Sequence, residues 1–101
     1  MGRVKTQKYR LVYSETSKNL IRKLHPQLKP IVKSKIERIK EDPYSGKYLE
    51  NELSGYLSLR AKRYRIIYKI DDNKNTIQIH YVGHRKDVYE LLGEQVRKKS
   101  E

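Results

Sequence analysis

Three kinds of reactive side chain lie close together in the segment YVGHRKDVYELL, residues 81–92. His84 and Arg85 are adjacent, and Tyr89 follows them. Histidine transfers protons near neutral pH, arginine is a permanent cation that can hold two phosphate oxygens, and tyrosine stacks on a base or donates a proton. This set suits cleavage of an RNA phosphodiester, in which a base takes the proton of the ribose 2′-OH and cations stabilise the phosphorane.

The sequence gives little support to other kinds of catalysis. A zinc site needs three or four convergent ligands, whereas His80 and His84 lie in a strand-to-loop segment where Asp87 is the nearest carboxylate. There is no cysteine, so thiolate metal sites and disulfides are excluded. Neither a glycine-rich phosphate loop nor a nucleophile elbow is present. We therefore predict no metal site.

The charge of the chain favours a polyanionic partner. Its 101 residues include 24 Lys and Arg against 12 Asp and Glu, a formal net charge of +12. No acid occurs in residues 1–14, 53–70 or 73–86, so the positive charge is localised. Nucleic acid is the usual partner of such a surface, although an anionic membrane or an acidic protein would also satisfy it. With no apolar run of about 20 residues and no secretory signal, we expect a cytoplasmic protein without membrane association.

The first half of the chain predicts one strand and two helices. Residues 8–14 are aromatic and β-branched, which is typical of a strand. A short helix follows within 14–25, with Ser14 or Thr16 as its cap. A second helix lies within 25–43, with Pro30 in its first turn and an apolar stripe at helical spacing formed by Leu28, Ile31, Val32, Ile36 and Ile39.

The second half predicts three consecutive strands. Residues 56–70 hold two strands with a turn near 61–63, and a hairpin turn at 71–75 leads into a strand at 76–83. Because side chains alternate between faces, each strand contributes to two faces. The expected buried face contains Leu57, Leu59, Ile66, Tyr68, Ile70, Ile77, Ile79 and Tyr81. The expected polar face contains Tyr56, Ser58, Arg60, Arg65, Ile67, Lys69, Gln78, His80 and Val82.

The predicted element order is βααβββα, where the last helix comes from residues 86–101. Consecutive strands late in the chain indicate an α+β fold. We expect a compact domain with an antiparallel sheet, two helices packed on one face and a short C-terminal helix. Residues 1–101 form this single domain, with flexible tails at 1–7 and 94–101.

Two segments resemble the RelE toxins of bacterial and archaeal type II toxin–antitoxin systems, within the RelE/ParE superfamily. ELSGYLSLRAKRYRIIYKI is similar to the family's Leu-x-Gly, strand, Arg, turn and Tyr-Arg-x-x-Tyr pattern. IHYVGHRKDVYELL is similar to its Gly-x-Arg strand end, followed by a Tyr that leads into the last helix. The pieces occur in the family's order, and the resemblance covers residues 8–92.

The resemblance implies a function and partners. One sheet face is expected to carry the two helices, and the other to cut mRNA, in the best-known members within the ribosomal A site, without a cofactor. A cognate antitoxin protein is expected to wrap the toxin. The complex of the two commonly represses its own operon, so operator DNA is expected as a partner only through the antitoxin complex.

The resemblance also assigns site residues. Arg65 and Arg85 are expected to stabilise the phosphate, and Tyr89 to stack on a base or assist proton transfer. Tyr56 and Ser58 stand where well-studied relatives carry two lysines, one of them the candidate general base. His84 is our predicted replacement, with His80 as the second choice. The residues predicted to contact mRNA or ribosomal RNA are Arg60, Lys62, Arg63, Tyr56, Lys69 and His80.

Two alternatives stay open beside a metal-independent mRNA endoribonuclease. The Arg and Tyr of the Tyr-Arg-x-x-Tyr pattern also occur in ParE-like toxins, which inhibit gyrase and are not nucleases. The absence of the strand lysine pair also fits a catalytically silent member that binds antitoxin or nucleic acid. RNA cleavage, DNA breakage and binding without cleavage distinguish the three.

Overall fold

The computed structural model describes residues 9–84 and residue 90. Two helices and five strands make up this part of the chain, with two short 3-10 turns, η1 and η2, beside β2. In chain order the elements are β1 (Arg10–Tyr13), α1 (Glu15–Arg22), α2 (Lys29–Glu41), η1 (Pro43–Ser45), β2 (Lys47–Tyr48), η2 (Asn51–Leu53), β3 (Leu57–Ala61), β4 (Tyr64–Asp71) and β5 (Thr76–His84). The predicted tails and most of the predicted C-terminal helix lie outside the described residues.

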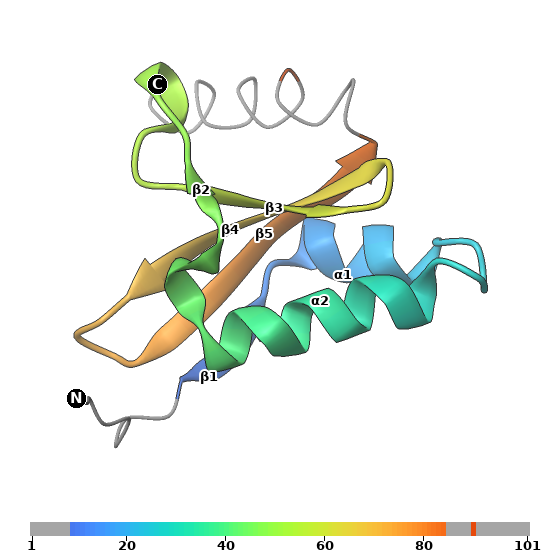
Figure 1. Cartoon of the computed structure of the whole chain (residues 1–101), viewed down its shortest axis with the longest axis horizontal. Coiled ribbons are helices and arrows are strands. Elements are labelled where there is room, and N and C mark those ends of the chain that lie inside the picture. Colours follow the sequence, from blue (N-terminus) through green and yellow to red (C-terminus); the bar gives the residue numbers. More distant parts are fainter. Residues whose placement is uncertain (1–8, 85–89, 91–101) are drawn as a thin grey trace.

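The strands form one sheet in the order β1-β5-β4-β3-β2. Strands β2 to β5 pair in antiparallel fashion, but β1 pairs with β5 in parallel. Both helices lie on the same side of this sheet (Figure 1). The predicted α+β class with two helices on one face is confirmed. The expectation of a wholly antiparallel sheet is wrong, because the chain crosses over through α1 and α2 and β5 returns beside β1 in the same direction.

The helices begin where the sequence predicts. Ser14 caps α1, and its Oγ accepts a hydrogen bond from the Ser17 N–H at 3.0 Å. Pro30 lies in the first turn of α2, where its missing N–H costs no hydrogen bond. Asp42 leaves the helical conformation and Pro43 follows it. Within the described residues, no helix is long and apolar enough to cross a membrane.

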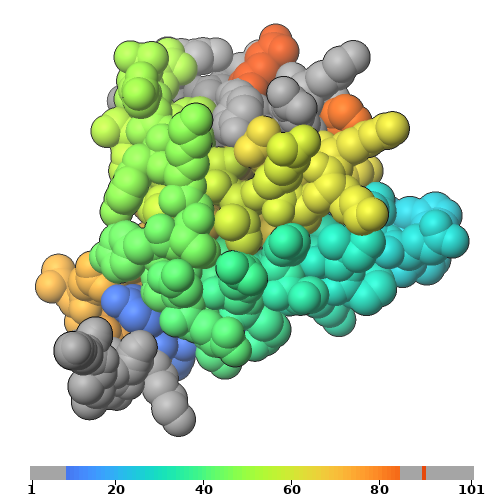
Figure 2. All heavy atoms as spheres, in the orientation of Figure 1, coloured from blue at the N-terminus to red at the C-terminus, as the bar shows by residue number. Residues whose placement is uncertain are grey.

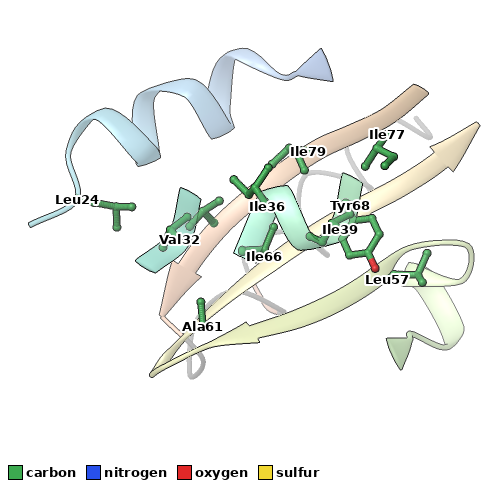
Figure 3. Packing of buried hydrophobic residues seen from close by; sticks show 11 residues of the cluster. Leu24, Val32, Ile36, Ile39, Leu57, Ala61, Ile66, Tyr68, Ile77 and Ile79 are labelled. Carbon is green, nitrogen blue, oxygen red and sulfur yellow. The ribbon is translucent and has the colours of Figure 1, made fainter. Parts of the chain in front are cut away.

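The main core lies between α2 and the sheet (Figure 3). From α2, Val32, Ile36 and Ile39 are buried against the strands. Burial of each large aliphatic side chain contributes about 1.5–3 kcal/mol. In the space-filling view, the chain from α2 through β2 to β3 forms one continuous surface (Figure 2). The sheet supplies Leu57, Ala61, Ile66, Tyr68, Ile77, Ile79 and Val82 to this core.

Tyr68 ties the segment after α2 to the sheet. Its ring is fully buried, and its hydroxyl donates to the Pro43 carbonyl at 2.7 Å. The same hydroxyl accepts a hydrogen bond from the Gly46 N–H at 3.0 Å. A Cβ at Gly46 would lie 2.5 Å from that hydroxyl, so only glycine fits there without a shift. This contact holds the segment that leads into β2 against the sheet.

A β-bulge in β5 changes which side chains face the helices. Ile67 pairs with Tyr81 and Tyr68 pairs with Ile79, which leaves His80 as an extra residue. Beyond the bulge every side chain changes face. Our placement of Tyr81 in the helix-side core and of Val82 on the polar face is therefore wrong. Val82 packs in that core, whereas Tyr81 packs with Ile67 on the other side.

Candidate nucleic-acid interface

Two arginines lie side by side on the sheet face opposite α1 and α2. Arg60 of β3 and Arg65 of β4 are direct cross-strand partners, and such partners have Cβ atoms about 4.5–5.5 Å apart. On its other side Arg65 pairs with Gly83, which has no side chain. Among residues 9–84 no carboxylate forms an ion pair with either arginine, and the buried Nε of Arg65 has no hydrogen-bond partner there. Like charges placed opposite each other are unfavourable, so an anion bound between them would stabilise the pair.

A second polar group occupies the other end of this face. The Tyr56 and His80 rings meet edge to face with their centroids 5.1 Å apart. The Lys69 Nζ lies 4.9 Å from the centroid of the Tyr56 ring, a cation–π contact. Nε2 of His80 lies 3.4 Å from Oε1 of Gln78. A phenol, an ammonium group and an imidazole from three different strand regions therefore gather at one place.

A small apolar cluster separates the two polar groups. Leu53, Ile67 and Tyr81 form it, with Ile67 fully buried, and Ser58 beside them is also buried. Arg65 and Lys69 are four positions apart on β4, which corresponds to about 13 Å at the usual rise per residue. The face is therefore not a uniform basic plane. It presents an arginine pair and an imidazole-containing group on either side of a packed centre.

His84 lies on the other side of the sheet from the arginine pair. It pairs with Tyr64 of β4, and their ring centroids are 5.8 Å apart. Tyr64 packs against the helix-side core, whereas Arg65, the next residue, points to the opposite face. The bulge at His80 causes this, since simple alternation would have placed His84 with His80. The catalytic role predicted for His84 stays a prediction, and its position separates it from Arg65.

The remaining predicted site residues lie at one end of β3 and β4 or beyond the described residues. Lys62 and Arg63 form the exposed turn between these strands, next to the pairing of Ala61 with Tyr64. Lys62 has φ +61°, a left-handed conformation that favours glycine or asparagine. Its charge lies beyond the arginine pair and extends the positive end of the sheet. Arg85 and Tyr89 lie outside the described residues.

One carboxylate cluster at the far end of β4 was not foreseen from the sequence. Asp72 accepts hydrogen bonds from the hydroxyls of Tyr9, at 2.5 Å, and Tyr44, at 2.7 Å. These bonds lower the pKa of Asp72, and the bond to Asp72 raises the pKa of Tyr44 to about 12. The cluster joins the start of β1, η1 and the β4–β5 turn. Within residues 9–84 and residue 90, no three His, Asp or Glu side chains gather to hold a metal ion.

Known proteins resemble this chain in both sequence and fold. Residues 15–89 match the family described as ParE toxin of type II toxin–antitoxin system, parDE. Toxin RelG of Mycobacterium tuberculosis is 35% identical over 83 residues, which are 80% of this chain and 95% of that protein. In the structure of the toxin–antitoxin complex RelBE2 from the same organism, the matching chain is 32% identical with a TM-score of 0.69, over 77% of this chain and 99% of that one.

A more distant structure shows the same fold. The isolated E. coli RelE toxin is 24% identical with a TM-score of 0.65, over 87% of this chain and 98% of that one. The shared architecture agrees with the two helices and mixed sheet described above. The sequence match over most of the chain and the fold lead to one assignment. The chain belongs to the RelE/ParE family and is a RelE-type toxin of a type II toxin–antitoxin system.

Proposed function

We propose that this toxin is a metal-independent endoribonuclease that cleaves mRNA on the ribosome and so inhibits translation. The pairing of Arg60 with Arg65 carries the proposal. Two permanent cations with no acidic partner among residues 9–84 form a phosphate site on the face opposite α1 and α2. Arginine suits this role because its planar fork can hold two phosphate oxygens at once.

The reaction follows from the groups on this face. The ribose 2′-oxygen attacks the adjacent phosphorus, and Arg65 with Arg60 stabilises the negative charge that grows on the phosphorane oxygens. Arg85 is proposed to act on the same phosphate and Tyr89 to stack on a base or assist proton transfer, as the family resemblance implies. Lys62 and Arg63 are proposed to contact ribosomal RNA, since both are exposed beside the arginine pair.

We propose a cognate antitoxin protein as the second partner. Structures similar to this chain include the toxin–antitoxin complex RelBE2 of M. tuberculosis and the intact E. coli RelBE complex. A chain of charge +12 attracts an acidic protein partner. An antitoxin that covers the Arg60–Arg65 pair would keep RNA away from this face. Operator DNA is proposed as a partner only of the toxin–antitoxin complex.

Primer extension on mRNA after induced expression tests the endoribonuclease. Wild-type toxin should give cleavage sites that disappear when ribosomes are prevented from loading on the transcript. Arg65→Ala should slow cleavage by about 10²-fold or more, which is typical for a lost transition-state donor. Arg38→Ala is the matched control, because Arg38 is exposed on α2, on the other side of the sheet. Intact transcripts with wild-type toxin, or equal cleavage by Arg65→Ala, would overturn the proposal.

A gyrase-inhibiting toxin is the second candidate. The family that matches residues 15–89 is described by its ParE toxins, which favours this function independently of the site. Purified gyrase with supercoiled DNA distinguishes the two. Toxin-dependent DNA breaks together with intact mRNA would establish the second candidate, and cleaved mRNA with intact DNA would exclude it.

A further inference from the structure

We propose that His80 is the group that accepts the proton of the ribose 2′-OH, and that Tyr56 positions it. This inference rests on the endoribonuclease function proposed above. It differs from the expectation drawn from the sequence, which favoured His84. It also assigns a role to Tyr56, which together with Ser58 stands where related toxins carry two lysines.

His80 lies at the β-bulge, on the same face of the sheet as the arginine pair. In such a bulge two consecutive residues oppose one residue of the neighbouring strand, and bulges re-aim side chains beside functional sites. Here His80 and Tyr81 together oppose Ile67 of β4. The ring contact of His80 with Tyr56 and the packing of Tyr81 with Ile67 place both side chains on the face of Arg65. The same bulge turns His84 toward Tyr64.

Tyr56 holds the imidazole across a strand. Its ring comes from the residue before β3, whereas His80 belongs to β5, so the two rings meet over β4. Their centroids are 5.1 Å apart at an interplanar angle of 77°, an edge-to-face contact that fixes the imidazole plane. Lys69 lies against the Tyr56 ring at 4.9 Å. Gln78 faces His80 from its own strand, with Oε1 3.4 Å from Nε2.

His80 lies within reach of a phosphate bound by the arginines. Arg65 pairs with Gly83, and Ile67 pairs with Tyr81, so His80 lies between two and three residues further along the strands than Arg65. This separation corresponds to roughly 8 Å along the strand direction. A phosphate together with its neighbouring ribose 2′-OH spans such a distance between an arginine and an imidazole. Lys69 is on the far side of His80, so the imidazole lies between two sources of positive charge.

The step requires no further reactant. His80 takes the 2′-OH proton while the 2′-oxygen forms a bond to phosphorus, and the bond from phosphorus to the 5′-oxygen breaks. The departing 5′-oxygen takes a proton from water, and the hydroxide that remains takes the proton from His80. The products are an RNA end with a 2′,3′-cyclic phosphate and an RNA end with a 5′-hydroxyl, and the imidazole is restored.

Single-turnover cleavage by purified toxin on ribosomes programmed with a short mRNA tests this role. His80→Gln should slow cleavage by about 10²–10⁴-fold, the usual contribution of a general base. It should also remove the rise of the rate with pH that a titrating imidazole gives. His25→Gln is the matched control, because His25 is exposed between α1 and α2, and it should keep both the rate and the pH profile. Tyr56→Phe should keep the rate because the ring contact remains, whereas Tyr56→Ala should lower it.

A second substrate separates proton acceptance from proton donation. An mRNA with sulfur in place of the bridging 5′-oxygen has a leaving group that needs no proton. If His80 is the base, His80→Gln stays slow on this substrate; full rescue by the sulfur would overturn the assignment. Wild-type rate for His80→Gln on ordinary mRNA, with Arg65→Ala slow, would reject this inference alone. Intact mRNA with wild-type toxin would reject the proposed function itself.

Discussion

The two faces of the sheet differ sharply although neighbouring residues of the same strands form both. On β4, Ile66 and Tyr68 are fully buried under the helices, whereas Arg65 and Lys69, which flank them in sequence, are only partly buried. The helix-side face is continuous and apolar, as expected of the surface that holds the domain together. The other face places like charges opposite each other, which costs stability and supports the anion binding that we propose there.

Adjacent residues of β4 give the strongest test of this contrast. Ile66→Ala should lower the free energy of unfolding by about 2–5 kcal/mol, because it leaves a cavity beneath α2. Arg65→Ala should change it by less than about 1 kcal/mol, since this removes a charge that repels Arg60. Urea denaturation of both variants measures the difference. Similar losses of stability in the two variants would contradict the division between the faces.

Two Tyr→Phe substitutions compare the two faces of the sheet, because each removes a single hydroxyl from one face. Tyr68→Phe should cost about 1–3 kcal/mol of unfolding free energy, because the Pro43 carbonyl and the Gly46 N–H lose their buried partner. Tyr56→Phe on the other face should cost less than about 0.5 kcal/mol, since its ring contacts remain. Thermal unfolding monitored by circular dichroism measures both. Equal costs would show that the Tyr68 hydroxyl is not needed for stability.

Substitutions of Lys62, in the turn between β3 and β4, test whether its positive charge is kept at a cost in folding stability. Lys62→Gly should raise the free energy of unfolding by up to about 1 kcal/mol, because glycine adopts a positive φ without strain. The same change should weaken single-stranded RNA binding, and the slope of log affinity against log salt should fall by about 0.7 for one lost phosphate contact. Lys62→Ala removes the charge and keeps the strain, so it should weaken binding without stabilising the protein. Unchanged RNA binding in both variants would remove Lys62 from the interface.

The smallest expected effect concerns the end of the sheet away from the arginines. Tyr44 should ionise at about pH 12 in the folded protein, against an ordinary pKa of 10.0, because its hydroxyl donates to Asp72. Since the folded pKa is raised, this bond contributes stability below pH 10 that is lost as the pH rises toward 12. The pKa of Asp72 is lowered, so its contribution is present at neutral pH and is lost in acid.

Ultraviolet absorbance of tyrosinate during a pH titration measures this effect. Asp72→Asn should move the Tyr44 ionisation back toward its ordinary range, whereas Tyr48→Phe should leave Asp72 bound to Tyr44. Tyr48 is the suitable control because it is exposed and raises the pKa of Tyr44 less than the hydrogen bond to Asp72 does. An unchanged titration in Asp72→Asn would show that this hydrogen bond does not control Tyr44.

Much of the fold could be predicted from local patterns. The apolar stripe of α2, the Ser14 cap and the position of Pro30 are set by residues within a few positions of each other, so the sequence alone identifies them. The arginine pair could also be predicted from the sequence. Both arginines fall on the polar side of two alternating strands, and a two-residue turn connects these strands. The strand β2 was missed because its two residues are both exposed and carry no apolar alternation.

The sequence by itself determined the helices, the three consecutive strands, the basic face and the family resemblance, because each depends on the type and spacing of nearby residues. Only the tertiary structure decided the parallel pairing of β1 with β5 and the bulge at His80. Strand register depends on the partner strand, and one inserted residue exchanges the faces of all that follow. That inserted residue moved Tyr81 to the face of Arg65, Val82 to the helix-side core and His84 toward Tyr64, which no local pattern could reveal.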